Sequence, residues 1–213
     1  MKPRQKPQIA ARKRPRQTRS SRLVADILEA AVRVLARDGA HRFTTARVAE
    51  AAGVSVGSLY QYFPNKQAIL FRLQSDEWQQ TGKMLDDILT DRSVAPLDRL
   101  RAAVRAFFRS EYDEAELRVA LGDAAPLYRD APETAEHRKA GLRRALAFMK
   151  EAFPGVPDRT RAFATDLVMT SMSAVGKQIS EQGRSRAEVD ALAVASGEMY
   201  CAYLERLMQT RGT

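Results

Sequence analysis

Residues 44–63, with the sequence TTARVAEAAGVSVGSLYQYF, carry the pattern that decides the fold of this chain. Two short helices are expected here, the first capped by Thr44 or Thr45 and the second by Ser55. Side-chain oxygens at such positions accept hydrogen bonds from backbone N–H groups of the first helical turn, which have no partner within the helix. Gly53 lies between the two helices and permits the positive φ that a tight break needs. The spacing therefore predicts two helices packed at a steep angle.

The outward side of this helix pair differs from its inner side. Four apolar residues are placed to hold the two helices together: Val48, Ala52, Val54 and Leu59. The second helix is predicted to present small and polar residues outward: Ser55, Val56, Gly57, Ser58, Gln61 and Tyr62. An ordinary helical hairpin in a core explains the apolar set equally well, but not the outward face. A face with so little bulk suits a helix that enters a DNA major groove, which is about 12 Å wide.

The rest of the chain also predicts helices, about nine in all. A first helix begins at Ser20 or Ser21 and ends at Gly39, and Asn65 caps a long helix over 66–90. Further helices are expected from Pro96, over 132–153, over 158–182 and over 186–209, where Ser185 and Glu188 form a capping box, with a broken segment at 111–131. No strand pattern of useful length occurs, so the fold class is all-α.

Positive charge is concentrated at the N-terminus. The 35 Lys and Arg exceed the 26 Asp and Glu by nine, and residues 1–22 hold nine of these cations and no acid, so the remainder is formally neutral. Residues 1–19 are therefore predicted to form a disordered basic arm, for which nucleic acid is the leading partner and a solvated tail the alternative. The arm lacks Trp, Phe and Leu, and no later stretch is long and apolar enough to span a bilayer, so no membrane role is expected.

The inventory of reactive residues argues against an enzyme. The chain has two histidines, His41 and His137, and one cysteine, Cys201, and it lacks phosphate-loop, dinucleotide-binding and nucleophile motifs. We expect no catalytic residues, no metal site and no cofactor, and we interpret His137 as a solvated helix residue. A single cysteine cannot form an internal disulfide, which favours a cytoplasmic location.

Residues 23–66 closely resemble the DNA-binding domain of the TetR family of transcriptional regulators. The matching positions are Phe43-Thr44-Thr45, Val48-Ala49, Ala52-Gly53-Val54-Ser55, Leu59-Tyr60-Gln61-Tyr62-Phe63, Asn65-Lys66 and Leu70. The resemblance implies a three-helix helix-turn-helix domain over residues 20–66. It also implies a C-terminal helical domain over 67–213 that binds an effector and dimerises.

The resemblance implies a DNA-binding role for each matching position. Thr45 is expected to contact phosphate, and Tyr60, Tyr62 and Lys66 to bind the phosphates that flank the groove. The base edges are expected to face Val56, Gly57, Ser58 and Gln61. This outward face contains no Arg, and Gln61, its best hydrogen-bonding side chain, suits adenine. Gly57 removes a side chain where some relatives contact a base, so part of the specificity is expected to come from DNA shape.

The last two predicted helices have apolar residues on more than one face. Residues 186–209 carry one stripe of Val194, Gly197, Cys201, Leu204 and Met208 and another of Leu192, Met199 and Tyr203. Residues 158–182 carry Val168, Met172, Val175 and Ile179, with Phe163, Leu167 and Ala174 beside them. Helices of this kind must bury both faces. We expect a two-fold homodimer through residues 158–209, with a thicker monomeric core as the alternative.

An apolar effector pocket is expected in the same domain. Its candidate lining is Phe108, Tyr112, Phe148, Met169 and Met172, although each of these residues taken singly also suits an ordinary core. The predicted function is that of a repressor bound to double-stranded, palindromic operator DNA. A small hydrophobic effector, which the sequence does not identify, is expected to release it from this DNA. Two alternatives remain open at this stage: an architectural DNA-binding protein without an effector, and a regulator controlled by a protein partner.

Overall fold

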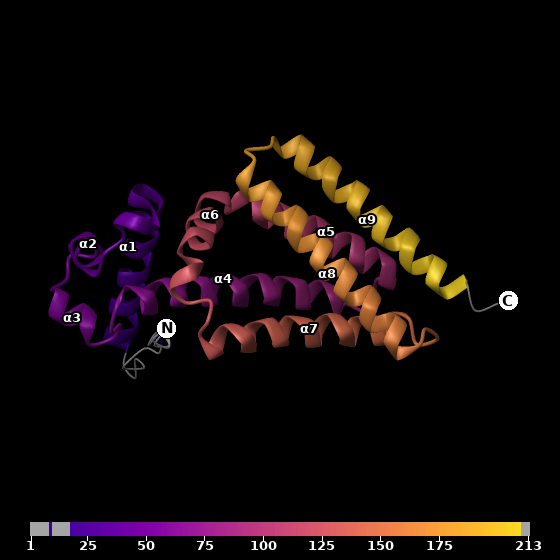
Figure 1. The fold of residues 1–213 in the computed structure, drawn as a ribbon, viewed down its shortest axis with the longest axis horizontal. Coiled ribbons are helices and arrows are strands. Elements are labelled where there is room, and N and C mark those ends of the chain that lie inside the picture. Colours follow the sequence, from indigo (N-terminus) through magenta and orange to yellow (C-terminus); the bar gives the residue numbers. More distant parts are fainter. Residues whose placement is uncertain (1–8, 10–17, 210–213) are drawn as a thin grey trace, which may run out of the picture. The chain divides into compact units, whose positions relative to one another are not determined.

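The computed structural model of the chain describes Ile9 and residues 18–209, and these residues form nine α-helices, one short 3₁₀ turn and no strand. The all-α prediction is confirmed. The chain divides into two compact units, unit 1 with residues 1–78 and 116–137 and unit 2 with residues 79–115 and 138–213. Figure 1 labels the helices in chain order. Among the described residues, no helix combines the length and the apolarity needed to cross a bilayer.

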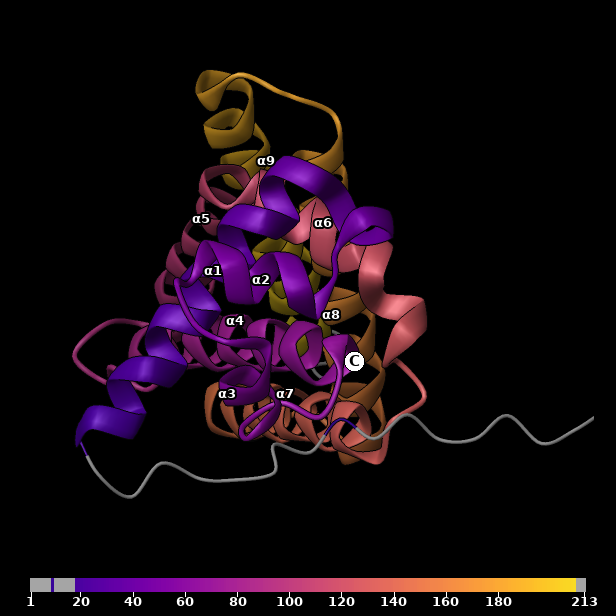
Figure 2. The same cartoon turned by 90° about the vertical axis from the view of Figure 1, so that its left-hand side faces the viewer.

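Unit 1 contains the predicted helix-turn-helix, whose three helices are seen from the front in Figure 2. Its elements are α1 (Thr18–Arg42), α2 (Thr45–Ala51), α3 (Val56–Tyr60), the first part of α4 (Lys66–Leu89), nearly all of α6 (Ala115–Ala124), the turn Ala125–Leu127 and the start of α7 (Pro132–Ala152). The side chains of Ile27, Leu35, Phe43, Leu59 and Phe63 are at most 1% exposed in its core. Burial of each such side chain stabilises the fold by about 1.5–3 kcal/mol.

Local signals in the sequence set the helix ends of unit 1. Thr44, Ser55 and Asn65 each accept a hydrogen bond from the backbone N–H three residues later, at 3.3, 3.0 and 2.8 Å. Gly53 has a φ of 66°, as predicted, and Gly39 interrupts the helical geometry of α1 with a φ of 69°. The predicted caps of α2, α3 and α4 are confirmed, with Thr44 rather than Thr45 as the cap of α2. The predicted cap of the first helix, Ser20 or Ser21, is wrong, because α1 already begins at Thr18.

The predicted arm over residues 1–19 is only partly covered by the structure. Ile9 is 4% exposed and belongs to the apolar core of unit 1, and α1 already begins at Thr18. The expectation of disorder is therefore wrong for Ile9 and for the last two residues of the arm. An apolar side chain next to an apolar core is more stable buried than in water. Residues 1–8 and 10–17, which carry most of the predicted charge, lie outside the described residues.

Unit 2 consists of the rest of α4, α5 (Pro96–Asp113), most of α7, α8 (Asp158–Glu181) and α9 (Arg186–Gln209). α5 packs against both α8 and α9 (Figure 1). At Gly176 in α8, an added Cβ would lie 2.7 Å from the Phe107 ring, so this close approach to α5 requires glycine. The predicted capping box is confirmed: the backbone N–H of Ser185 donates to Glu188 at 2.8 Å, and that of Glu188 donates to the Ser185 hydroxyl at 3.3 Å.

The two units do not follow the domain boundary expected at residue 66. α4 continues from unit 1 into unit 2, and residues 116–137 join unit 1. Buried polar contacts explain this division. Arg118 of α6 pairs with Glu77 of α4 at 2.8 Å, and the buried Tyr128 donates to Gln74 at 3.1 Å. The sequence pattern shows where helices begin and end, but not which distant helices share polar partners.

Candidate functional site

The outward face of α3 is exposed and small. Ser55, Val56, Gly57 and Gln61 are exposed, and Ser58 is partly covered. The Ser55 and Ser58 hydroxyls lie 2.8 Å apart, because Ser55 caps the helix and turns its oxygen toward the first turn. The exposed N-terminal end of α3 thus has no bulky side chain except Val56, and Gln61 offers an amide at its other end.

Hydroxyl groups from two helices meet beside this face. The Thr45 Oγ1 at the start of α2 and the Tyr60 Oη at the end of α3 lie 3.1 Å apart. Both belong to the predicted phosphate-binding set, so the fold brings these two side chains together. Lys66, from the same set, is the first residue of α4 and is half-buried.

Tyr62 does not lie on the outward face. Its side chain is 6% exposed and packs in the core of unit 1, as does that of the following residue, Phe63. The prediction of an outward Tyr62 is wrong because α3 ends at Tyr60, with Gln61 as its C-cap. Continuing the helical spacing past this end places residue 62 on the wrong side.

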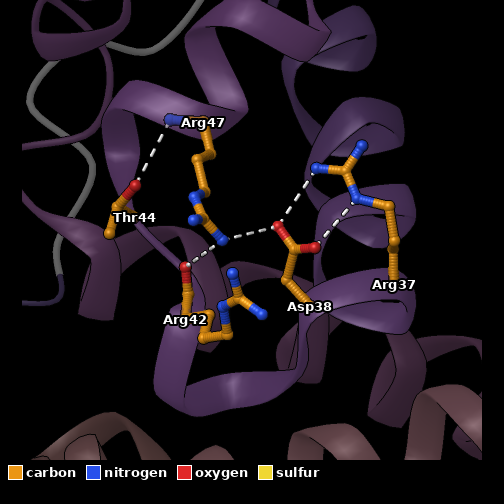
Figure 3. A network of polar contacts seen from close by, with 5 residues as sticks. All are labelled: Arg37, Asp38, Arg42, Thr44 and Arg47. Carbon is orange, nitrogen blue, oxygen red and sulfur yellow. Dashed lines mark hydrogen bonds and ion pairs between the residues drawn. The ribbon is translucent and has the colours of Figure 1, made fainter.

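A polar network joins α1 to α2 (Figure 3). The Asp38 carboxylate accepts hydrogen bonds from Arg37 at 2.9 Å and from Arg47 of α2 at 3.0 Å, and Arg47 also donates to the Arg42 carbonyl at 3.4 Å. These arginines, Arg37 first, lower the pKa of Asp38 to about 2. The network connects α2 to the end of α1, and the sequence pattern did not predict it. An acid directly before Gly39, where the helical geometry of α1 is interrupted, was the available signal.

His137 is not the solvated helix residue that the sequence suggested. Its Nε2 lies 2.9 Å from the Ser75 hydroxyl, and its ring centroid lies 5.2 Å from that of Trp78 and 6.3 Å from that of Phe71. It is therefore part of the packing of α7 on α4 within unit 1. Across the described part of the chain, no cluster of His, Cys, Asp and Glu is suited to hold a metal ion.

Unit 2 contains a cavity of about 170 Å³ that is partly open to solvent and has a mainly apolar lining. Phe148, Met169 and Met172, three of the five residues predicted for a pocket, line it. Phe108 and Tyr112 do not line it, and Phe107 does. Adjacent residues on a helix point about 100° apart, and in α5 it is Phe108, fully buried, that points into the core.

Unit 2 exposes large apolar side chains on its last two helices, a set that we call the apolar face of α8 and α9. Phe163 and Leu167 of α8 and Val194 and Met199 of α9 are 65%, 44%, 52% and 58% exposed. By contrast, Cys201 and Leu204, which the sequence grouped in one stripe with Val194, are buried in the core of unit 2. The two long helices therefore bury one side within the unit and present apolar side chains on another.

Comparison with protein families matches two stretches of the chain. Residues 27–73 match the family described as bacterial regulatory proteins, tetR family. Residues 95–207, just over half of the chain, match the tetracyclin repressor-like C-terminal domain. A family of regulators agrees with the expectation that the chain is not an enzyme. The resemblance seen in residues 23–66 is thus confirmed and extended to the C-terminal unit.

Individual relatives agree with this result. The fatty acid metabolism regulator protein of Bacillus subtilis (strain 168) is 33% identical over 69 residues, a match that spans 32% of this chain and only 36% of the relative. The fatty acid degradation regulator FadR from Bacillus halodurans has a TM-score of 0.70 at 19% identity, covering 88% of this chain and 97% of its own. FadR from Bacillus subtilis in complex with stearoyl-CoA has a TM-score of 0.66 at 19% identity, covering 83% and 97%. These structural likenesses establish the fold, and the family matches establish that the chain belongs to the TetR family of transcriptional regulators.

Proposed function

We propose that this protein is a homodimeric repressor that a small, mainly apolar effector releases from a palindromic operator. The observation that carries the proposal is the presence, in one TetR-family chain, of an exposed, small-residue face on α3 and of an apolar cavity in the C-terminal unit. The first feature suits DNA and the second suits a ligand. A regulator that responds to a metabolite needs both.

Base recognition is assigned to the exposed residues of α3. Gln61 presents both a donor and an acceptor, the pair that matches the N6 and N7 of adenine. Val56, Gly57 and Ser58 allow the start of the helix to approach the base edges closely. Because Ser55 caps α3, its role is to fix the helix, and its hydroxyl is engaged with Ser58.

Phosphate contacts are assigned to Thr45, Tyr60 and Lys66. The Thr45 and Tyr60 hydroxyls are 3.1 Å apart, close enough for one phosphate oxygen to accept a hydrogen bond from both. Lys66 adds a positive charge at the start of α4. Contacts of this type set the register of the protein on DNA and carry no base specificity.

Dimerisation is assigned to the exposed apolar face of α8 and α9. Apolar patches of this kind on a protein surface indicate a protein interface. A two-fold axis that brings α8 and α9 of two chains together would cover Phe163 and Met199 in both and form a four-helix interface. It would also supply the second recognition helix that a palindromic site requires.

The effector is assigned to the cavity of unit 2. One structural neighbour of the same fold is described in complex with stearoyl-CoA, which supports the proposal that a small molecule binds this protein. The cavity of about 170 Å³ is close in size to an engineered apolar cavity of about 150 Å³ that binds benzene. A small apolar group therefore fits the volume present.

Selection of binding sites from random duplexes with the full-length protein tests the proposed function. We expect enrichment of one palindrome, bound at least about 10³-fold more tightly than random DNA. A reporter placed behind that palindrome should be expressed less when the protein is present and recover when an effector is added. Enrichment of no sequence would overturn the proposal in favour of an architectural protein. Enrichment together with activation of the reporter would overturn the repressor assignment alone.

A further inference from the structure

Two opposite charges lie at the apolar cavity of unit 2. Asp86 of α4 and Arg144 of α7 both line it, and the Arg144 Nε lies 3.3 Å from the Asp86 Oδ1. Their side chains are 43% and 37% exposed, so the pair sits where the cavity meets solvent. The two other polar residues that line the cavity, Thr165 and Ser173, carry no charge. The pair is therefore the only charged feature that a ligand in this cavity meets among the described residues.

The absence of a side chain at Gly82 on the facing helix leaves space for the Arg144 guanidinium. An added Cβ at Gly82 of α4 would lie 2.7 Å from the Arg144 Nη2 and 3.2 Å from its Cζ, so the guanidinium rests directly on the α4 backbone. Glycine in a helix interior is destabilising relative to alanine. This glycine is the feature of α4 that makes room for the guanidinium beside the cavity.

The guanidinium keeps hydrogen-bonding capacity for a ligand. Among the described residues, its ion pair with Asp86, closest at Nε, is the one polar contact that the guanidinium makes. Two neighbouring N–H groups in a plane match the two oxygens of a carboxylate, which is the geometry of the strongest Arg pairs. A guanidinium is also weakly hydrated, so it tolerates the apolar surroundings of a cavity better than a carboxylate does.

The volume limits the apolar part of the ligand. A cavity of about 170 Å³ accepts a single ring or a short chain, and it lies below the 300–1,000 Å³ that is typical of sites for drug-sized ligands. Phe107, Phe148 and Met172 in the lining offer ring and thioether contacts to such a group.

We propose that the effector is a small apolar carboxylate, with its ring or short chain in the cavity and its carboxylate bound by Arg144. This inference rests on the proposed function and names the chemistry of the ligand at that same cavity. A second carboxylate beside Asp86 repels it, because like charges within a few ångströms disfavour each other. Binding therefore weakens the Arg144–Asp86 ion pair that connects α7 to α4, and α4 is the helix that begins at Lys66. Exposed ion pairs contribute little to stability, so the exchange costs little.

Calorimetric titration of the full-length protein with three matched probes tests the proposal. The probes are phenylacetate, its neutral amide phenylacetamide, and the cation phenethylamine, which share a ring of the size that the cavity accepts. We expect phenylacetate to bind at least tenfold more tightly than either of the others. Arg144→Gln should remove this preference and leave binding of phenylacetamide unchanged, which also shows that the variant is folded.

Two further variants separate position from charge. Gly82→Ala pushes the guanidinium aside without changing any charge, and it should lower phenylacetate affinity while sparing phenylacetamide. Asp86→Asn removes the competing carboxylate and should tighten phenylacetate binding severalfold. The matched controls are Arg143→Gln and Asp87→Asn, exposed neighbours of the same charge that do not line the cavity, and both should bind phenylacetate as the unmodified protein does.

The outcomes distinguish this inference from the proposed function. Equal binding of phenylacetate and phenylacetamide, a preference for phenethylamine, or no binding of any probe at millimolar concentration would overturn the carboxylate assignment. A preference that survives Arg144→Gln would overturn the role of Arg144. If phenylacetate binds in the expected way but leaves affinity for the selected palindrome unchanged, the site assignment stands and the effector-controlled repressor fails.

Discussion

The protein exposes two faces of opposite chemistry, one in each compact unit. In unit 1, α3 presents Ser55, Gly57 and Gln61, which are small or polar. In unit 2, α8 and α9 present Phe163 and Met199, which are large and apolar. The first face loses little by staying in water and gains by meeting polar base edges. The second is stabilised only by losing contact with water, so its partner must be apolar.

The two faces are also built differently. The short helices α2 and α3 are fixed by local features, namely the caps Thr44 and Ser55 and the positive φ of Gly53. The face of unit 2 lies on helices of 24 residues whose positions depend on packing against α5. Changes in unit 2 should therefore act through assembly, and changes in unit 1 through local geometry.

The largest effect is expected from a charge in the apolar face of unit 2. Met199→Glu should convert the proposed dimer into monomers of 23.8 kDa. Met199 is exposed in the single chain, and a carboxylate at this position would be buried in the dimer without an opposite charge or a hydrogen-bond donor to pair with it. Affinity for the selected palindrome should fall by about 10²–10⁴-fold, since the second half-site no longer binds as part of one complex. Light scattering after size exclusion measures the mass.

The matched control is Leu142→Glu, an equivalent change at a leucine that is 41% exposed on α7. It should leave both mass and DNA affinity unchanged. If Met199→Glu keeps the mass of a dimer, the interface lies elsewhere.

A medium effect is expected from the turn in unit 1. Gly53→Ala should lower the stability of unit 1 by about 1–2 kcal/mol, because a side chain disfavours the φ of 66° found there. Urea unfolding followed by the fluorescence of Trp78, the single tryptophan of the chain, reports on this unit.

Gly122→Ala provides the comparison, because an added Cβ meets no atom within 4 Å at either position and only Gly53 has a positive φ. The Gly122 variant should gain about 0.4–1 kcal/mol. Equal effects of the two changes would contradict the role of backbone geometry at the turn.

The smallest effect is expected from the Asp38 network, and it depends on pH. The pKa of Asp38 is lowered from 3.8 to about 2, so its contribution to stability is present above pH 3.8 and is lost as the pH falls toward 2. Asp38→Asn should therefore be less stable than the unmodified protein at pH 6, and the difference should disappear near pH 2. Thermal unfolding across this range measures it, with Asp26→Asn on the same helix as a control for surface charge. A difference that is constant with pH would contradict the assignment.

Local features made much of unit 1 predictable. Capping residues act on the backbone three positions away, so the caps Ser55 and Asn65 could be placed from the sequence alone, and the cap of α2 could be narrowed to Thr44 or Thr45. Tyr62 was misplaced because the end of α3 depends on how the next turn packs, and helical spacing does not show it.

The cavity was predictable in kind but not in detail. Aromatic and methionine residues indicated an apolar pocket, yet the choice between Phe107 and Phe108 depends on how α5 is rotated against α8 and α9. The Asp86–Arg144 pair joins residues 58 positions apart, and no local pattern marks such a contact. Long-range packing determines these features, as it does the membership of residues 116–137 in unit 1.

The most direct test of the central claim is the effect of Gln61→Ala on sequence preference. Affinities for the selected palindrome, for each of its single-base-pair variants and for random DNA are measured at one salt concentration, with the unmodified protein and with this variant. We expect the variant to lose about 1–3 kcal/mol on the palindrome and to lose its preference at one base pair in each half-site, with the other positions unaffected. Lys66→Ala should weaken binding to all the sequences about equally. An equal loss on the palindrome and on random DNA for Gln61→Ala would show that α3 does not recognise bases through this residue.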